Sequence, residues 1–236
     1  MAESNDDAAY CRDRVSRFDP DRAAAIAFQP ADARPALYAL HAFNLEVAQL
    51  RETAGEPVLG AMRLQWWRDA LDEAASGRER RHAVLQPLAA AIRDHDLPED
   101  RFRRLLDARE TDLEATPPAD LPAYARETGG TLAALAGQVV SGRAGNEDIG
   151  TAWALVGWLR AAAFFGWTLP EGAEPRAVAE QAKALLEPAR DGYGRALAAL
   201  TRGYIRKLDR LDYDLSDSRA AGPLRLRGWR IALGRD

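Results

Sequence analysis

Acidic residues at helical spacing are the first candidates for chemistry in this chain. Asp69 lies four positions before Glu73, with Asp72 between them, and Asp107 lies three positions before Glu110. Carboxylates at these spacings share a helix face, where they could bind Mg²⁺ and, through it, a diphosphate. The commoner arrangement for such a face is solvent exposure with ion pairs to nearby arginines. We therefore treat these five residues as metal or diphosphate ligands only if the protein is an enzyme.

Other kinds of catalytic chemistry have little material in this sequence. The chain has three histidines and a single cysteine, Cys11. Zinc sites and catalytic triads need clusters of histidine or cysteine. One cysteine excludes an internal disulfide and is typical of a reducing compartment. The sequence therefore predicts no catalytic residue and no metal site of these kinds.

The composition is that of a globular chain without a strong charge bias. Of its 236 residues, 47% are hydrophobic and 29% charged, and the net charge is −4. This balance argues against disorder and gives no reason to expect nucleic acid as a partner. The acidic, polar start predicts no signal peptide. The longest apolar stretch, residues 149–169, carries Arg160 in its middle, so we expect a buried helix there rather than a membrane span.

Helical periodicity runs through almost the whole chain, with Pro and Gly at the breaks. Asp19 and Pro20 offer an N-cap and a first-turn proline for a short helix. Further helices are predicted over residues 33–52, 57–75, 84–94, 98–114, 120–140, 147–165, 175–186, 190–211 and 221–233. No strand pattern of useful length appears. The sequence predicts an all-α fold with one helical domain over residues 19–236, preceded by a polar segment or short helix over residues 1–18.

The predicted helix 57–75 carries a charge within its apolar side. Its apolar stripe consists of Leu59, Met62, Trp66, Trp67, Ala70, Leu71 and Ala74. Arg63 falls within the arc of that stripe. A charge that faces a core needs a partner, unless its long stem carries it past its neighbours to water. We expect Arg63 to point inward and to be paired.

The predicted helix 33–52 has a polar stripe beside its core face. Ala36, Leu40, Phe43, Val47 and Leu50 form the core face. The polar stripe contains His41, Asn44, Ala48 and Glu52, and its last three members repeat at every fourth position. They therefore lie on one side of the helix.

Several segments resemble the squalene/phytoene synthase family. Residues 38–46 and 64–71 resemble its first signature, and further matches lie in residues 105–113, at Tyr124 and in residues 158–160. The resemblance covers about residues 22–170 and extends more loosely beyond them. It implies an isoprenoid-synthase-like helical bundle around a central cavity.

The family's acidic motifs are missing where the resemblance places them. In the family, two acidic patterns hold Mg²⁺ ions that bridge to a prenyl diphosphate and stabilise its departure. Their positions here are Ala48-Gln-Leu-Arg-Glu52 and Ala161-Ala-Ala-Phe-Phe165, so Glu52 is the one carboxylate left. The resemblance thus implies a protein without a cofactor. By family position, the cavity lining is expected to include His41, Asn44, Ala48, Glu52, Arg63, Gly157, Arg160, Ala161 and Phe165.

Residues 44–51, 60–68 and 208–215 resemble more closely a degenerate branch of the family. That branch is implicated in assembling respiratory NADH:quinone oxidoreductase (complex I) at the inner membrane. The resemblance implies a non-catalytic assembly or scaffold factor in the cytoplasm of a bacterium, with respiratory complex subunits or assembly proteins as partners and peripheral contact with the membrane. Two alternatives stay open. One is an Mg²⁺-dependent head-to-head prenyl transferase acting on farnesyl or geranylgeranyl diphosphate, and the other is a lipid or isoprenoid carrier.

Overall fold

The computed structural model describes residues 2–49, 56–78, 80–114 and 116–224, and all regular structure within them is helical. The all-α prediction is confirmed. In chain order the helices are α1 Ala2–Phe18, α2 Pro20–Ala27, α3 Arg34–Ala48, α5 Pro57–Ala75, α6 Leu85–Asp94, α7 Glu99–Ala108, η1 Arg109–Leu113, α8 Leu121–Ala125, η2 Arg126–Gly130, α9 Thr131–Ser141, α10 Glu147–Phe165, α11 Pro175–Ala184 and α12 Gly192–Arg210. Here η1 is a 3₁₀ turn and η2 a π turn.

Local capping explains where the main helices begin and end. The Asp19 side chain accepts a hydrogen bond from the Arg22 backbone N–H at 3.1 Å, and Pro20 occupies the first turn of α2. Asn146 accepts hydrogen bonds from the backbone N–H groups of residues 148 and 149, and so caps α10. The helix α10 ends at Gly166, whose φ of 69° suits glycine. These signals are readable in the sequence, and the predicted bounds of α5 and α10 match the structure.

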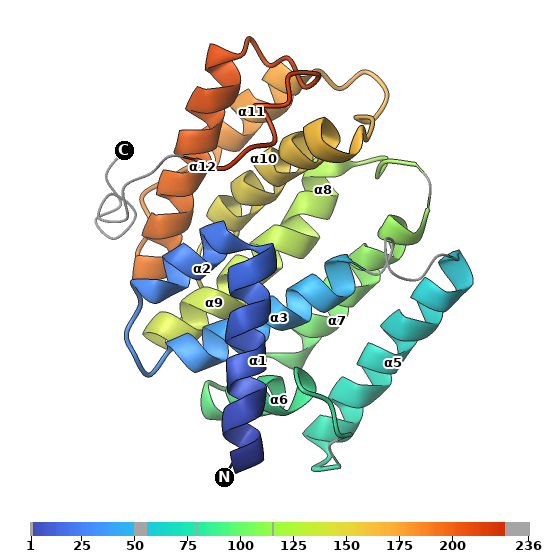
Figure 1. The fold of residues 1–236 in the computed structure, drawn as a ribbon, viewed down its shortest axis with the longest axis vertical. Coiled ribbons are helices and arrows are strands. Elements are labelled where there is room, and N and C mark those ends of the chain that lie inside the picture. Colours follow the sequence, from blue (N-terminus) through green and yellow to red (C-terminus); the bar gives the residue numbers. More distant parts are fainter. Residues whose placement is uncertain (1, 50–55, 79, 115, 225–236) are drawn as a thin grey trace.

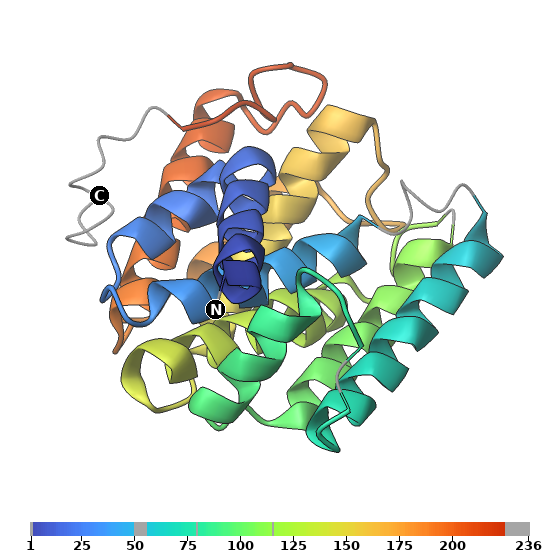
Figure 2. The same ribbon diagram turned by 60° about the horizontal axis from the view of Figure 1, so that its bottom comes forward.

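Two helices, α3 and α10, form the centre of the bundle (Figure 1). Helix α3 packs against α1, α2, α6 and α9, and it is buried on almost every side. Helix α10 packs against α8, η2, α9, α11 and α12. Figure 2 shows α1 crossing over α3 at the surface. Helix α3 is therefore held mainly by helices from the first half of the chain and α10 by helices from the second half, and α9 contacts both.

Glycines let η2 and α10 approach each other closely. A Cβ on Gly129 would lie 2.5 Å from the carbonyl oxygen of Gly150, and a Cβ on Gly150 would clash with the carbonyl oxygen of Gly129. Side chains at either position would force the two backbones apart. The π turn that precedes α9 is thus fixed against α10.

Helix α5 lies at one edge of the molecule, opposite α12 (Figures 1 and 2). Its buried face consists of Gly60, Leu64, Trp67 and Ala70. The predicted stripe shared Trp67 and Ala70 with this face but was wrong in Leu59 and Met62, which are exposed. The buried face of α5 is thus rotated from the predicted stripe toward Gly60 and Leu64.

The two ends of the chain differ from the sequence predictions. Helix α1 is a 17-residue helix rather than a short one, and its residues Cys11 and Val15 are buried. Burial raises the pKa of the Cys11 thiol to about 12. At the other end, the described part of the predicted helix 221–233 is not helical, and residues 225–233 lie outside the described part.

Turns also interrupt two predicted helices. The segment 98–114 ends as the 3₁₀ turn η1, and the segment 120–140 contains the π turn η2 between α8 and α9. Within the described part of the chain, no helix is long and apolar enough to cross a bilayer.

Candidate functional site

A cavity of about 340 Å³ lies between α3, α10 and the η1–α8–η2 segment. We call it the central cavity. The ends of α1 and α2 also reach it through Phe18 and Arg22. Its walls divide into an aromatic side and a polar side, which come from different elements.

The aromatic side comes mainly from α10 and the residues after it. Trp153, Trp158, Phe165 and Trp167 all line the cavity. Their rings form a series: the Phe165 and Trp167 centroids are 5.0 Å apart, and those of Trp167 and Trp158 are 5.3 Å apart. Trp158 in turn contacts Tyr124 edge to face at 5.6 Å. This wall offers a broad apolar surface to a ligand.

The polar side is built around Arg109 on η1. Its Nη1 atom donates to Asp112 Oδ2 at 2.9 Å and to the Tyr124 hydroxyl at 2.6 Å, and its Nη2 atom donates to Asn44 Oδ1 at 3.2 Å. The Tyr124 hydroxyl donates to Asp112 Oδ1 at 2.7 Å. Burial raises the pKa of Tyr124, so the phenol keeps its proton. Four cavity residues from three elements are therefore joined in one network.

A second arginine enters the cavity from α2. Arg22 pairs with Asp19 at 2.7 Å, and its guanidinium lies 5.6 Å from the Trp153 ring centroid. Burial lowers the pKa of Arg22, Asp19 raises it, and the like charge of Arg109 lowers it, with a net rise. Two charged guanidinium groups thus line the same cavity and are close enough to repel each other.

Five residues of the expected lining come together here. Asn44, Ala48, Gly157, Ala161 and Phe165 all line the central cavity. Three of the other four, His41, Arg63 and Arg160, lie outside this lining. Glu52, together with the rest of residues 50–55, is outside the described residues.

His41 is buried, and Arg160 half-buried, elsewhere in the bundle. His41 faces α12, where its Nε2 atom and the Tyr193 hydroxyl are 2.8 Å apart. Arg160 pairs with Asp21 at 3.3 Å and stacks over the Tyr204 ring at 3.7 Å. Both helices, α3 and α10, are packed on several sides, so a position on the helix does not determine which neighbour a side chain meets.

The expectation that Arg63 points inward was wrong, because its side chain is exposed. It lines a separate surface groove of about 500 Å³ beside Trp66, Trp67 and Glu46. The rotation of the α5 core face toward Gly60 and Leu64 turns Arg63 outward.

The acidic residues considered as metal ligands lie on the surface, outside the central cavity. Arg68 pairs with both Asp107 and Glu110, at 2.8 and 2.7 Å. The other pairs are Arg80 with Glu73, and Arg103 with Asp72, while Asp69 accepts from Gln65 at 2.8 Å. These are the solvated ion pairs that such spacings commonly make.

The donor set of the central cavity does not fit an Mg²⁺ cluster. Among the described residues, Asp112 is the one carboxylate that lines it. Both oxygens of Asp112 already accept hydrogen bonds, from Arg109 and Tyr124. The described residues include no group of three or more His, Cys, Asp or Glu side chains that could hold a metal ion. A guanidinium beside the single carboxylate would also repel a divalent cation.

Sequence reasoning missed the polar side of the cavity. Arg22, Arg109 and Asp112 were not predicted as site residues, although Arg109 and Asp112 lie in the segment 105–113 that resembles the family. In the sequence, each arginine was marked by an oppositely charged residue three positions away, next to an apolar run. Such a pair is common on exposed helices, so spacing alone does not distinguish it.

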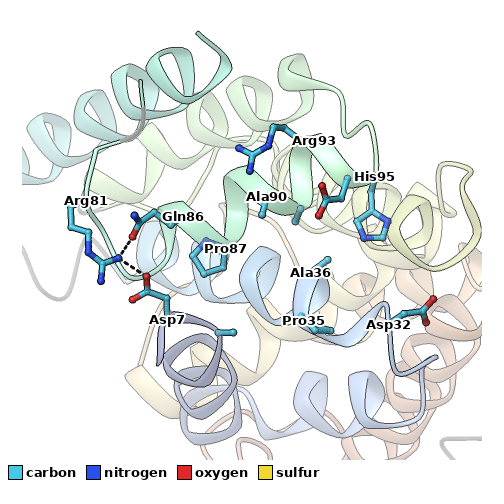
Figure 3. Close-up of a pocket in the computed structure, with 13 residues that line it drawn as sticks. Asp7, Asp32, Pro35, Ala36, Arg81, Gln86, Pro87, Ala90, Arg93 and His95 are labelled. Atoms are coloured by element: carbon cyan, nitrogen blue, oxygen red, sulfur yellow. Dashed lines mark hydrogen bonds and ion pairs between the residues drawn. The ribbon is translucent and has the colours of Figure 1, made fainter. Parts of the chain in front are cut away.

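A further hollow of about 490 Å³ lies between α1, the start of α3 and α6 (Figure 3). Its most prominent polar contact joins Arg81 to Asp7 and Gln86. The remaining labelled polar groups, including Asp32 and His95, stand around the rim (Figure 3). Its lining is more polar than that of the central cavity.

The helical bundle with a cavity between α3 and α10 places the chain in the class of isoprenoid-synthase-like folds. A solved dehydrosqualene synthase matches 99% of this chain and 95% of its own, with a TM-score of 0.75 and 16% identity. Squalene synthase HpnC from Alicyclobacillus acidocaldarius matches with a TM-score of 0.62 and 21% identity, covering 95% and 98% of the two chains. At these identities the likeness shows the fold alone.

The family model of squalene/phytoene synthases matches residues 15–163, and the chain belongs to this family. Curated relatives include complex I assembly factor 6 from Bos taurus, 28% identical over 165 residues, and from Homo sapiens, 27% identical over 165 residues. Each alignment covers 66% of this chain and 50% of the relative. The chain spans about half the length of these relatives.

Proposed function

We propose that this protein is a non-catalytic member of the family that acts as an assembly or scaffold factor for respiratory NADH:quinone oxidoreductase. The observation that carries the proposal is the lining of the central cavity. Ala48, Ala161 and Phe165 line it at positions where the family resemblance implies metal-binding acids. The carboxylate among the described lining residues, Asp112, is held by Arg109. The names of the curated relatives support the partner.

The test is deletion of the gene in its native host. The proposal predicts less assembled NADH:quinone oxidoreductase on native gels, with lower NADH-linked quinone reduction in membranes, and restoration of both by the intact chain. The same complementation is repeated with Ala161→Asp, which alters the cavity. If this variant fails to restore the complex, the cavity takes part in assembly; if it restores the complex, the rest of the molecule is sufficient. Normal amounts of the complex in the deletion strain would rule out the assembly role.

We also propose that no metal cofactor is needed for this role. The arginine-paired Asp112 supports this, because a carboxylate that accepts from a guanidinium at 2.9 Å is a poor Mg²⁺ ligand. Purified protein should show the same thermal unfolding midpoint with EDTA as with Mg²⁺. A midpoint raised by Mg²⁺ would contradict this part of the proposal.

Peripheral contact with a membrane is part of the proposed role. Phe164 is 72% exposed at the end of α10, and Phe165 and Phe18 beside the cavity are 49% and 48% exposed. The Arg17 guanidinium lies 5.2 Å from the Phe18 ring centroid, so aromatic and basic groups stand together as they do at lipid interfaces. Vesicles containing phosphatidylglycerol should sediment the wild type, and less of Phe164→Ser/Phe165→Ser. The matched control is Leu59→Ser/Met62→Ser, which alters exposed apolar residues of α5, and equal loss in both variants would contradict this contact.

A second candidate function is a lipid or isoprenoid carrier. The aromatic wall of the 340 Å³ cavity favours it, because such a lining suits an apolar chain. Native mass spectrometry of the purified protein should then show a bound lipid that is displaced when the cavity is filled by Gly157→Leu. A bare protein mass after gentle purification would count against the carrier function.

A further inference from the structure

The described lining of the central cavity includes two positive charges, whereas the family resemblance implies carboxylates in this cavity. Arg22 on α2 and Arg109 on η1 both line it, and their like charges act on each other. Bringing two guanidinium groups together in a partly dry cavity is unfavourable unless anions compensate them. Asp19 and Asp112 each neutralise one of them, yet Asp19 is not part of the lining. Among the described residues, the lining itself therefore has an excess of positive charge.

Hydrogen-bond donors are also in excess on this lining. The Nε atoms of Arg22 and Arg109 and the Nε1 atom of Trp158 are buried without an acceptor among the described residues. Arginine and the indole N–H only donate, so none of these groups can satisfy another. The three nitrogens are shielded from solvent, so they do not contact a ligand in this conformation. They nevertheless make the surroundings of the cavity rich in hydrogen-bond donors. An oxygen-rich anion is the chemical group that this environment favours.

We propose that the central cavity binds an amphiphile with an oxyanion head, a carboxylate or a phosphate monoester, directly and without a metal ion. The head lies between Arg22 and Arg109. The chain lies along the aromatic wall formed by Trp158, Phe165 and Trp167, which leads to the exposed Phe164. This inference is independent of the assembly role, since it concerns the purified protein alone.

The test compares ligands that share one chain and differ in the head. Laurate and dodecyl phosphate are titrated into the full chain in EDTA below their micelle concentrations, with dodecyltrimethylammonium as the charge-reversed control. Binding is followed by calorimetry and by the rise in unfolding temperature. Both anions should bind, and the cation should bind at least about tenfold more weakly. The ratio between the two anions identifies the preferred head. Equal binding of the cation, no binding of either anion, or binding that requires Mg²⁺ would overturn the proposal.

Two variants test the position of the head. Ala161→Asp adds a negative charge to the cavity lining without touching the arginines, and it should weaken the anions about tenfold. Its control is Ala163→Asp, on the same helix and equally half-buried but outside the lining. The double change Arg109→Met/Asp112→Leu removes a whole ion pair and so avoids leaving a lone buried charge. It should also lose anion binding. Unchanged affinity in Ala161→Asp and the double variant would show that the head lies elsewhere.

Discussion

Asp112 and Arg109 show how a single residue pair decides the chemistry of the cavity. The carboxylate is 13% exposed, and its two oxygens accept from a guanidinium and a phenol. A carboxylate in this state stabilises a buried cation and is not available to a metal ion. The same contacts make the pair important for stability, because either partner alone would be a buried charge without compensation.

Asp112→Ala should therefore lower the free energy of unfolding by about 3–5 kcal/mol. Its control is Asp107→Ala, which breaks an exposed ion pair with Arg68 and should change stability by less than about 1 kcal/mol. Urea unfolding followed by circular dichroism gives both values. Equal effects of the two substitutions would mean that the Asp112 network contributes no more than a surface pair.

His41 predicts a dependence of stability on pH. Burial, and then the nearby Arg22 guanidinium, hold the pKa of His41 well below its ordinary value of 6.5. The unfolded chain binds a proton at His41 below about pH 6.5, whereas the folded protein does not, so stability falls as the pH drops below that value. The slope approaches about 1.4 kcal/mol per pH unit for one histidine.

The measurement is the free energy of unfolding at about pH 7.5 and about pH 5.5 for the wild type and His41→Gln. The wild type should lose more stability on acidification than the variant. His82, whose pKa is also lowered by burial, leaves part of the slope in place. An equal loss in both proteins would show that His41 carries none of it.

At the scale of elements, the contact between η2 and α10 is set by backbone approach. Gly150 on α10 meets Gly129, whereas Gly157 seven residues later has nothing within 4 Å of an added Cβ. These two glycines on one helix therefore differ in packing while sharing the same intrinsic helix preference. They form a matched pair for testing the contact.

Gly150→Ala should destabilise the protein by several kcal/mol, because the methyl group must displace the backbone of η2. Gly157→Ala should stabilise it by about 0.5–1 kcal/mol, the usual gain in a helix interior. Thermal and urea unfolding of both variants provide the values. Similar small effects in both would mean that η2 and α10 separate easily.

Most helices and part of the cavity lining could be predicted from the sequence. Caps and breakers such as Asn146, Gly166 and Pro57 are local signals, so α5 and α10 could be predicted within a residue or two. The family resemblance implied lining positions on α3 and α10, such as Asn44 and Gly157, that do line the cavity, but it misplaced Arg160 and Arg63. Those two depend on which neighbouring helix packs against each face, and that is a tertiary property. Arg22 and Arg109 were missed for the same reason, since they meet only after folding.

At the scale of the whole molecule, the family fold has a cavity whose described lining contains two arginines and one carboxylate. The acidic residues that remain near helix faces, such as Asp69 and Asp107, lie outside the cavity on the surface. They come from α5 and α7, and most are already paired with arginines. A diphosphate held there would be exposed to water rather than enclosed. The proposed non-catalytic role therefore requires that the protein does not perform the family's metal-dependent chemistry.

Diphosphate release tests this claim most directly. Purified protein is incubated with farnesyl or geranylgeranyl diphosphate and with Mg²⁺ or Mn²⁺, beside an active member of the family and the variants Asp69→Ala and Asp107→Ala. The account predicts no metal-dependent release above the protein-free background at a concentration where the active member turns over readily. Metal-dependent release that either variant abolishes would contradict it and would place a working acidic site on the surface of α5 and α7.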